Sequence, residues 1–283
     1  SKEKHLNYKL DQKIKIKLLD WTKLSSLQSA IRGNQIILHL AGMNSQDCLK
    51  SPEEAKNVNG YNTKILLEIA SSLKVKEFIF LSTAHVYSDN LQGYFDENTP
   101  TINQHPYATS NILGEHFVKE FHYRKKINAK ILRLSNTFGA PAIENKLCWS
   151  LFINNICKQI AEYKEVKIYS NPKTNRNFLA ISDFNNFLLQ ILRKDLVLDD
   201  NIILNVGSTK SFRLDEMANL ITYNYFKFCK KKIEIIYKFE KDIHDKSLDY
   251  EFSINKLLDL GIMPSNSLEI ELINLFKYCN KSF

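Results

Sequence analysis

Short apolar runs typical of β-strands alternate with longer helical patterns along almost the whole chain of 283 residues. The first half contains four of these runs, KIKIKLLD (13–20), QIILHLAG (35–42), KEFIFLST (76–83) and NAKILRLSN (128–136). Alternation of this kind is typical of a parallel sheet whose strands are joined by crossover helices. We therefore expect an α/β fold built on a doubly wound, Rossmann-like parallel sheet.

The character of the elements changes near residue 140. Strands before that point are densely apolar, whereas the elements that follow are shorter and their loops are more polar. This change predicts a larger domain over residues 1–140 and a smaller C-terminal α/β domain over residues 141–283. We expect the smaller domain to cover the cleft and bind substrate, with some of its strands returning to the main sheet.

Composition argues against several other classes of protein. With 44% apolar residues, the chain can build a full core. No apolar run approaches the length of about 18 residues that a membrane span needs, and the polar start lacks the apolar stretch of a secretory signal. We therefore expect a cytoplasmic protein without a membrane partner.

Cysteine and histidine positions do not indicate a metal site or a disulfide framework. The five cysteines, at positions 48, 148, 157, 229 and 279, include no CxxC pair, and the seven histidines are scattered. We expect reduced thiols and no bound metal. The net charge of +8 reflects lysines spread along the chain, so no nucleic-acid partner is expected, whereas an anionic small-molecule substrate is compatible.

Small or polar residues stand at the ends of the predicted strands. They are Asp20, Gly42, Thr83 and Asn136. In open α/β sheets, ligands bind beyond the carboxyl ends of the strands. Ordinary turn chemistry explains any one of these residues, but their recurrence at successive strand ends favours a binding site.

Another candidate lies at the start of a predicted helix, in the stretch HPYATSNILGEHF (105–117). Tyr107 and Asn111 stand four residues apart, so they share one helical face and can act on one ligand. A tyrosine there is either a catalytic acid or an aromatic residue that begins a helix.

Taken together, these segments resemble the extended short-chain dehydrogenase/reductases, in the branch of nucleotide-sugar epimerases, dehydratases and reductases. NVNGYNTKILLEIA (57–70) is similar to the family's NxxGTxNLLEAA helix, and FLSTAHVYS (80–88) to its SSxxVYG strand. The stretch from Asp96 to Glu115 resembles DExxP…PYxxSKxxxE. LRLSNTFGAP (132–141) resembles LRxxNxYGP, and TNRNFLAISD (174–183) resembles xxRDFxxVxD. The match also includes HLAG and the closing LLDLGIMPSNSLEIEL, so it covers nearly the whole chain.

This resemblance implies hydride transfer between a sugar carbon and NAD or NADP. Tyr107 would be the acid/base for the sugar hydroxyl, and Thr83 would hydrogen-bond the substrate oxygen. Asn111 would be the third catalytic position. The cofactor would be lined by Asp20 at its adenine end, by Leu40, Ala41, Gly42 and Asn59 along its length, and by Ser135 at the nicotinamide.

On the substrate side, the resemblance implies a nucleotide-diphosphate sugar. Asn136 and Arg176 would bind it, since a guanidinium suits phosphate oxygens. The implied activity is epimerisation or 4-keto reduction in surface polysaccharide synthesis. Dehydratase members of the family have a motif like TDE where this chain has Thr83, Ala84 and His85. Dehydration is therefore expected less than epimerisation or reduction. The helices at 52–73 and 107–126 resemble the pair through which the family dimerises, so we expect a homodimer.

One departure from the family pattern is the absence of a glycine-rich phosphate loop. None of the eight glycines is spaced as GxGxxG, and the chain opens at what corresponds to the third strand. We expect that it is truncated at its N-terminus and that a longer chain carries this turn.

A second departure is Asn111, where the family has lysine. A tyrosine with a pKa near 10 is only about one part in a thousand ionised at neutral pH. A lysine about 5 Å away would supply roughly 3 kcal/mol toward the phenolate, and asparagine carries no charge. The alternative interpretation is therefore a catalytically degenerate member that binds a nucleotide or sugar nucleotide as a sensor or partner subunit.

Overall fold

The computed structural model describes residues 15–142, 147–194, 201–239 and 249–283. Its main sheet has four parallel strands in the order β1-β2-β4-β8. Their bounds are β1 (Ile36–His39), β2 (Glu77–Thr83), β4 (Asn128–Leu134) and β8 (Ile203–Val206). The predicted α/β class with a parallel sheet is confirmed.

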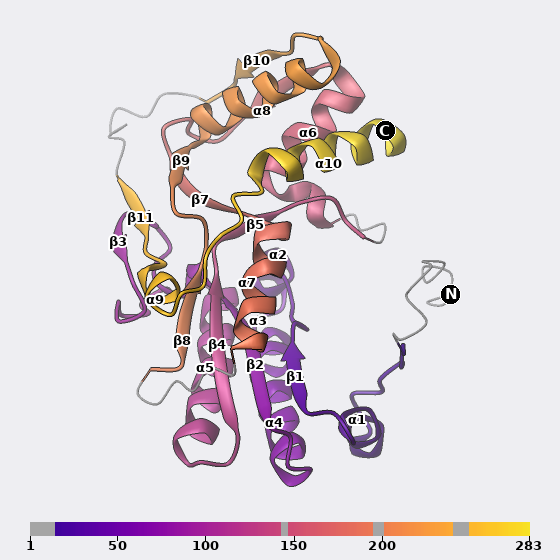
Figure 1. Ribbon diagram of the computed structural model, residues 1–283, viewed down its shortest axis with the longest axis vertical. Helices are drawn as coiled ribbons and strands as arrows, with labels where there is room; N and C mark the ends of the chain where they lie inside the picture. Colours follow the sequence, from indigo (N-terminus) through magenta and orange to yellow (C-terminus); the bar gives the residue numbers. More distant parts are fainter. Residues whose placement is uncertain (1–14, 143–146, 195–200, 240–248) are drawn as a thin grey trace.

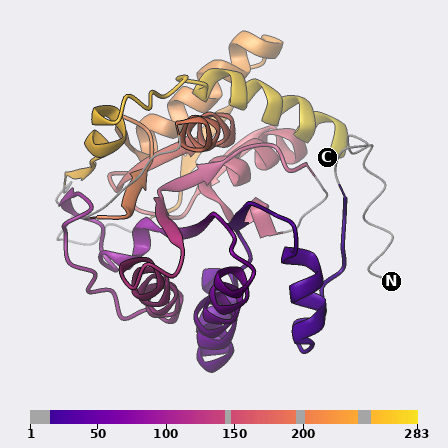
Figure 2. The ribbon, with the colours of Figure 1, turned by 60° about the horizontal axis from the view of Figure 1, so that its bottom comes forward.

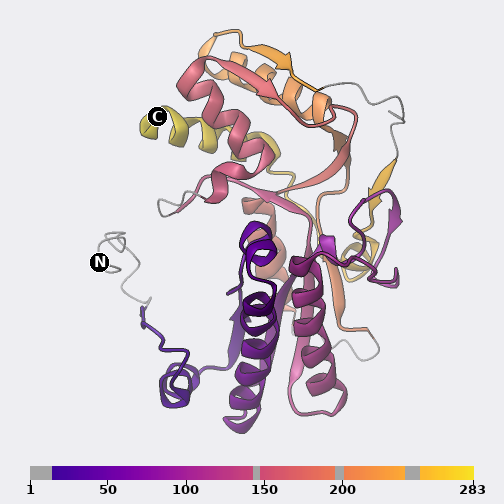
Figure 3. The same ribbon diagram turned by 180° about the vertical axis from the view of Figure 1, so that it is seen from behind.

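Helices cover both faces of this sheet (Figure 1). On one face lie α4 (Asn62–Ser72) and α5 (Pro106–Tyr123), seen in front in Figure 3, and on the other lies α7 (Ile181–Arg193). The view in Figure 2 shows the sheet between the two layers. Both faces of β2 are therefore buried, which explains why its sequence reads as a continuous apolar run.

The long helix predicted over 52–73 forms as three consecutive segments. These are α3 (Pro52–Ala55), the π-helical turn η2 (Lys56–Tyr61) and α4. Ser51 occupies the N-cap position, but its side chain makes no capping hydrogen bond. The π turn adds backbone to one side of the helix, and its buried residues are Asn59 and Gly60.

The strand predicted at 13–20 is not present in the part of it that the structure describes. Residues 15–20 have no strand pairing, and Leu18 is 71% exposed. In the doubly wound order 3-2-1-4-5-6, the third strand is not a neighbour of the fourth, so this segment has no partner in β1. Strand β1 was predicted as a buried strand. Because only β2 pairs with it among the described residues, it is an edge strand, and Ile36 is 39% exposed.

A second hydrophobic cluster lies beyond the carboxyl ends of the main sheet. It is built by α6 (Phe152–Tyr163), α8 (Leu214–Cys229) and α10 (Leu268–Ser282), which pack on two small sheets. These sheets are β5 (Asn136–Phe138) with β7 (Asn175–Ala180) and β9 (Ser211–Arg213), and β6 (Glu165–Ile168) with β10 (Glu234–Tyr237). Strand β8 lies between two parts of this region in the chain, after β7 and before β9, and it returns to the main sheet. The division at residue 140 stays a prediction.

The remaining elements are short. They are α1 (Leu24–Ile31), α2 (Ser45–Lys50), α9 (Asn255–Asp259), η3 (Ala84–Val86) and η4 (Leu147–Ser150), together with the paired strands β3 (Gly93–Phe95) and β11 (Tyr250–Phe252). Within the described ranges, no helix is long and apolar enough to cross a membrane.

Candidate active site

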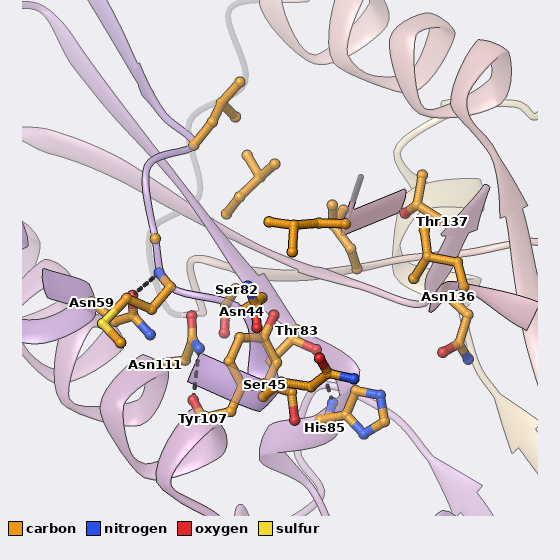
Figure 4. Close-up of a pocket in the computed structure, with 18 of the residues that line it drawn as sticks. Asn44, Ser45, Asn59, Ser82, Thr83, His85, Tyr107, Asn111, Asn136 and Thr137 are labelled. Carbon is orange, nitrogen blue, oxygen red and sulfur yellow. Dashed lines mark hydrogen bonds between the residues drawn. The ribbon is translucent and has the colours of Figure 1, made fainter. Parts of the chain in front are cut away.

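A cavity of about 690 Å³ opens at the carboxyl ends of β1, β2 and β4. Thr83 of β2 and Leu134 of β4 are aligned in register, so the residues that follow each strand reach the cavity at the same level. Helix α5 forms another wall, and η4 faces it from the second cluster. Of the predicted site residues, the cavity is lined by Leu40, Ala41, Gly42, Asn59, Thr83, Tyr107, Asn111, Ser135 and Asn136 (Figure 4).

Tyr107 stands in the first turn of α5, with its ring in the cavity wall. His105 occupies the N-cap, where its Nδ1 accepts a hydrogen bond from the backbone N–H of Tyr107 at 3.1 Å. Burial raises the pKa of the Tyr107 phenol, a hydrogen bond with the Thr83 side chain opposes the rise, and Cys48 adds to it. The structure thus brings the two predicted hydroxyl groups together.

The amide of Asn111 is directed along the helix. Its Nδ2 donates to the backbone carbonyl of Tyr107 at 2.7 Å, and the residue is only 7% exposed. Among the described residues, the side chains that shift the pKa of Tyr107 are Thr83 and Cys48, and neither carries a positive charge. The phenol therefore lacks the electrostatic support that a lysine would supply.

Asn59 holds the loop that follows β1. Its Oδ1 accepts from the backbone N–H of Met43 at 2.7 Å, and its Nδ2 donates to Ser110 Oγ at 2.9 Å. A Cβ on Gly42 would stand 3.0 Å from Asn59 Oδ1, so glycine allows this close approach. Leu40 and Ala41 are consequently exposed to the cavity, where a flat ligand can lie against them.

The hydroxyl of Ser135 marks a point in the cavity wall where a polar group of a ligand can bind. Its Oγ is buried in the cavity wall, and it has no hydrogen-bond partner among the described residues. A buried hydroxyl without a partner is costly unless a ligand or water satisfies it. The site therefore fits a cofactor carrying a polar group at this point, as a carboxamide does.

Arg176 lies beside the cavity rather than in it. It lines an adjoining pocket of about 170 Å³, which shares Asn136, Thr137 and Leu151 with the main cavity. Its Nη1 donates to the carbonyl of Asn175 at 3.0 Å, and burial lowers its pKa. Within the described residues no carboxylate pairs with this guanidinium, so it can bind an anionic ligand.

Asp20 is the predicted site residue that lines neither the main cavity nor the adjoining pocket. Its Oδ1 accepts from the backbone N–H of Thr22 at 3.0 Å and from its Oγ1 at 2.6 Å. Its Oδ2 also pairs with Lys23 at 3.3 Å. The carboxylate of Asp20 thus stabilises its own turn, and it does not line the cavity with the other predicted site residues.

A comparison with models of known protein families shows which family has a sequence of this kind. The model of the NAD dependent epimerase/dehydratase family matches residues 1–207. The chain belongs to this family. The family predicted from the sequence is confirmed, and its description names the NAD dependence that the resemblance implies.

Relatives of this chain include the mouse (Mus musculus) protein described as dTDP-D-glucose 4,6-dehydratase. It is 26% identical over 250 residues, which cover 88% of this chain and 68% of the mouse protein. The human (Homo sapiens) protein of the same description is 28% identical over 184 residues, and the match spans only 50% of its length. The chain thus covers between half and about two thirds of these relatives.

Solved structures share the fold of the family. A UDP-glucuronic acid 4-epimerase from Bacillus cereus in complex with NAD superimposes with a TM-score of 0.73, at 21% identity, over 91% of this chain and 76% of that one. RMD from Pseudomonas aeruginosa, complexed with NADPH, gives a TM-score of 0.77 at 17% identity, over 94% of this chain and 89% of that one. Both confirm the Rossmann-like α/β fold.

Sequence reasoning missed several residues that line the cavity, among them Asn44, Thr137 and the segment at 147–151. A signal existed for Asn44, because Asn-Ser-Gln-Asp directly after a strand is a helix-start pattern. Asn44 Oδ1 accepts from the backbone N–H of Asp47 at 3.0 Å and caps α2. The segment at 147–151 gave no such signal, since only the packing of the second cluster brings it over the cavity.

Proposed function

We propose that the chain is an NAD(P)-dependent nucleotide-sugar epimerase or 4-keto reductase that acts in surface polysaccharide synthesis. The observation that carries the proposal is the pairing of Tyr107 with Thr83 in the wall of the strand-end cavity. A phenol and a hydroxyl that lie close together in one cavity wall can receive a sugar oxygen between them. That is the arrangement needed to move a proton at a carbinol oxygen.

The roles of the residues follow from their positions. Thr83 would hold the sugar oxygen, and Tyr107 would take its proton during oxidation or return it during reduction. The dinucleotide, when bound, supplies a ring that accepts or donates a hydride. The dinucleotide would lie along Leu40, Ala41 and Gly42. Its nicotinamide end would supply a hydrogen-bond partner for the buried hydroxyl of Ser135.

The proposed substrate is a nucleotide-diphosphate sugar. Asn136 lines both the main cavity and the adjoining pocket, and Arg176 stands in that pocket without a carboxylate partner in the described chain. A sugar in the main cavity would therefore carry its diphosphate toward the guanidinium. Dehydration ranks below epimerisation and reduction, because Ala84 and His85 supply no carboxylate beside Thr83.

The second candidate function is a degenerate member that binds a nucleotide or sugar nucleotide as a sensor or partner subunit. The specific observation in its favour is Asn111, whose amide is bonded to the helix backbone and whose position supplies no charge to the phenol. In this case the cavity would bind its ligand but turn it over negligibly.

We further propose a cytoplasmic homodimer that pairs through α4 and α5.

Identifying the molecules that copurify with the protein separates these functions. Protein expressed from the complete reading frame is denatured, and the released small molecules are identified by mass spectrometry. Tightly bound NAD(H) supports an epimerase, and exchangeable NADPH supports a reductase. A sugar nucleotide without a dinucleotide supports the degenerate reading. A Tyr107→Phe variant as active as the wild type on nucleotide sugars would overturn the catalytic proposal.

A further inference from the structure

The C-terminal ends of α6 and α8 form a surface that the proposed roles leave unused. Strands β6 and β10 follow these two helices in the chain, and they pair in parallel with Glu165 opposite Glu234. Because the two strands begin at the same level, the turns that precede them stand side by side. Figure 1 shows α8 and β10 at the top of the molecule, far from the main sheet.

Helix α8 has a buried side and an exposed side with aromatic rings. The buried side includes Met217, Ile221 and Tyr225, which belong to the second hydrophobic cluster. On the exposed side, Tyr223 is 55% exposed and Phe226 is 37% exposed. Their spacing of three residues places both rings on one face of the helix. This face is apolar surface that the described part of the fold does not bury.

Lysines accompany these rings. Lys227 Nζ lies 4.6 Å from the centre of the Tyr223 ring, and Lys230 Nζ lies 5.9 Å from that of Phe226. Both lysines are exposed, and among the described residues neither has a carboxylate partner. The sequence from 227 to 238 contains five lysines and one glutamate. Positive charge is therefore concentrated where the aromatic rings are exposed.

The basic rim is the exposed surface that these side chains form with the adjacent turns. It consists of Tyr163, Lys164, Tyr223, Phe226, Lys227, Lys230, Lys231 and Lys232. The acidic residues that flank it in the chain are Glu162, Glu165 and Glu234. Glu162 pairs with Lys158 at 3.6 Å, and Glu165 pairs with Lys167 at 2.6 Å. Lysines outside the rim thus offset these two charges, and the rim keeps a positive net charge.

We propose that the basic rim binds the surface of an anionic lipid bilayer. Each lysine near such a surface contributes a factor of about five to binding, through attraction to acidic headgroups. Tyrosine and phenylalanine rings suit the headgroup level, where an apolar body is buried while polar groups stay in water. A nucleic-acid duplex would also attract the lysines, but its phosphate surface has no apolar layer to receive an exposed phenylalanine.

This inference goes beyond the proposed function and does not depend on it. No residue of the basic rim lines the main cavity or the adjoining pocket. The expectation of no membrane partner rested on the lack of a spanning segment, and attachment to a bilayer surface needs none.

Cosedimentation with lipid vesicles tests the proposal on the whole chain. Vesicles of phosphatidylcholine with about 30% phosphatidylserine are compared with vesicles of phosphatidylcholine alone. We expect binding to the anionic vesicles only, and we expect salt to weaken it. Lys230→Gln/Lys231→Gln should lower the partition coefficient by about 25-fold, because two charges are removed. Phe226→Gln should lower it as well, because the ring no longer enters the headgroup layer.

The matched control is Lys125→Gln/Lys126→Gln at the end of α5, which lies at the bottom of Figure 1. Lys125 and Lys230 both have a left-handed backbone after their helices, with φ of 54° and 62°, and each double variant removes two exposed charges. The control should bind the vesicles as the wild type does. Equal loss of binding in the two double variants would show that net charge alone matters, which would overturn the proposal.

Two other results would also overturn it. One is a wild type that binds the anionic vesicles no better than the neutral ones. The other is lysine-dependent binding to a DNA duplex without binding to the vesicles, which would assign the basic rim to nucleic acid. Hydride transfer is measured separately without lipid, as reduction of NAD⁺ by nucleotide sugars. Its absence would count against the proposed function and leave the membrane result standing.

Discussion

The amide of Asn111 donates along α5 to the carbonyl of Tyr107, which leaves the neighbouring phenol without a cationic partner. Burial then dominates and raises the pKa of Tyr107 above its ordinary value. The phenolate is the form that accepts a proton, and it is scarce at neutral pH. Any activity that depends on it should therefore rise with pH through the neutral and mildly alkaline range.

Replacing Asn111 by lysine should shift this pH profile toward acid. An ammonium about 5 Å from the phenol would stabilise the phenolate by roughly 3 kcal/mol, which lowers its pKa by about two units. The rate at neutral pH should then rise by up to about 100-fold, and the plateau should be reached at lower pH. The measurement is kcat against pH for hydride transfer with a nucleotide sugar.

Asn111→Gln provides the neutral control for this prediction. It keeps an amide at the position and adds no charge, so its pH profile should match that of the wild type. If the lysine variant gains neither rate nor cofactor affinity, the phenol is not limited by the missing charge.

At the scale of elements, α5 is held close to the sheet and to the π turn by small residues. A Cβ on Gly114 would meet the backbone carbonyl oxygen of Asn59 and the tip of the Phe80 ring, each at 2.7 Å. A Cβ on Gly60 would instead meet the side chain of Leu113 at 2.5 Å. A backbone oxygen cannot move aside as a side chain can. We therefore expect a methyl group to be tolerated less well at Gly114 than at Gly60.

Gly114→Ala should therefore destabilise the protein by about 2 kcal/mol, because overpacking outweighs the gain of about 1 kcal/mol in helix propensity. Gly60→Ala is the matched control and should cost less, since Leu113 can rotate. The measurement is the free energy of unfolding from denaturant titration. Equal stability of the two variants would show that the contact with Asn59 and Phe80 does not restrict α5.

Over the whole molecule, the helix pair formed by η2 with α4 and by α5 presents an outer face that carries aromatic side chains. Tyr61 is 48% exposed, and its ring lies 5.9 Å from that of Phe117. A face of this kind suits burial against a second copy, because aromatic residues dominate interface energetics. It is the face through which we propose the homodimer.

Tyr61→Asp should weaken that dimer. Burying a carboxylate at the centre of an interface should cost at least about 2 kcal/mol, which raises the dissociation constant by about 30-fold. Sedimentation over a range of concentrations measures this constant. The control is Tyr223→Asp on α8, where the tyrosine is 55% exposed on another element. A monomeric wild type, or equal dimerisation of both variants, would rule out this interface.

Much of the architecture follows from local patterns in the sequence. Apolar runs and helical periods predict β2, β4 and α5, because both faces of the central strands are buried and each helix has one apolar side. Motif resemblance also predicts the family and the residues Thr83, Tyr107 and Asn136. Periodicity does not reveal the π turn at Lys56–Tyr61, since an inserted residue only shifts the helical phase.

The sequence by itself determined which side chains stand at the strand ends and that residue 111 is uncharged. Only the tertiary structure decided what those side chains do. It bonds the amide of Asn111 to its own helix, leaves Ser135 Oγ without a partner in the described chain, and turns His85 toward the cavity. The physical reason is that a hydrogen-bond partner or an open face depends on segments distant in the chain, and local spacing carries no record of them.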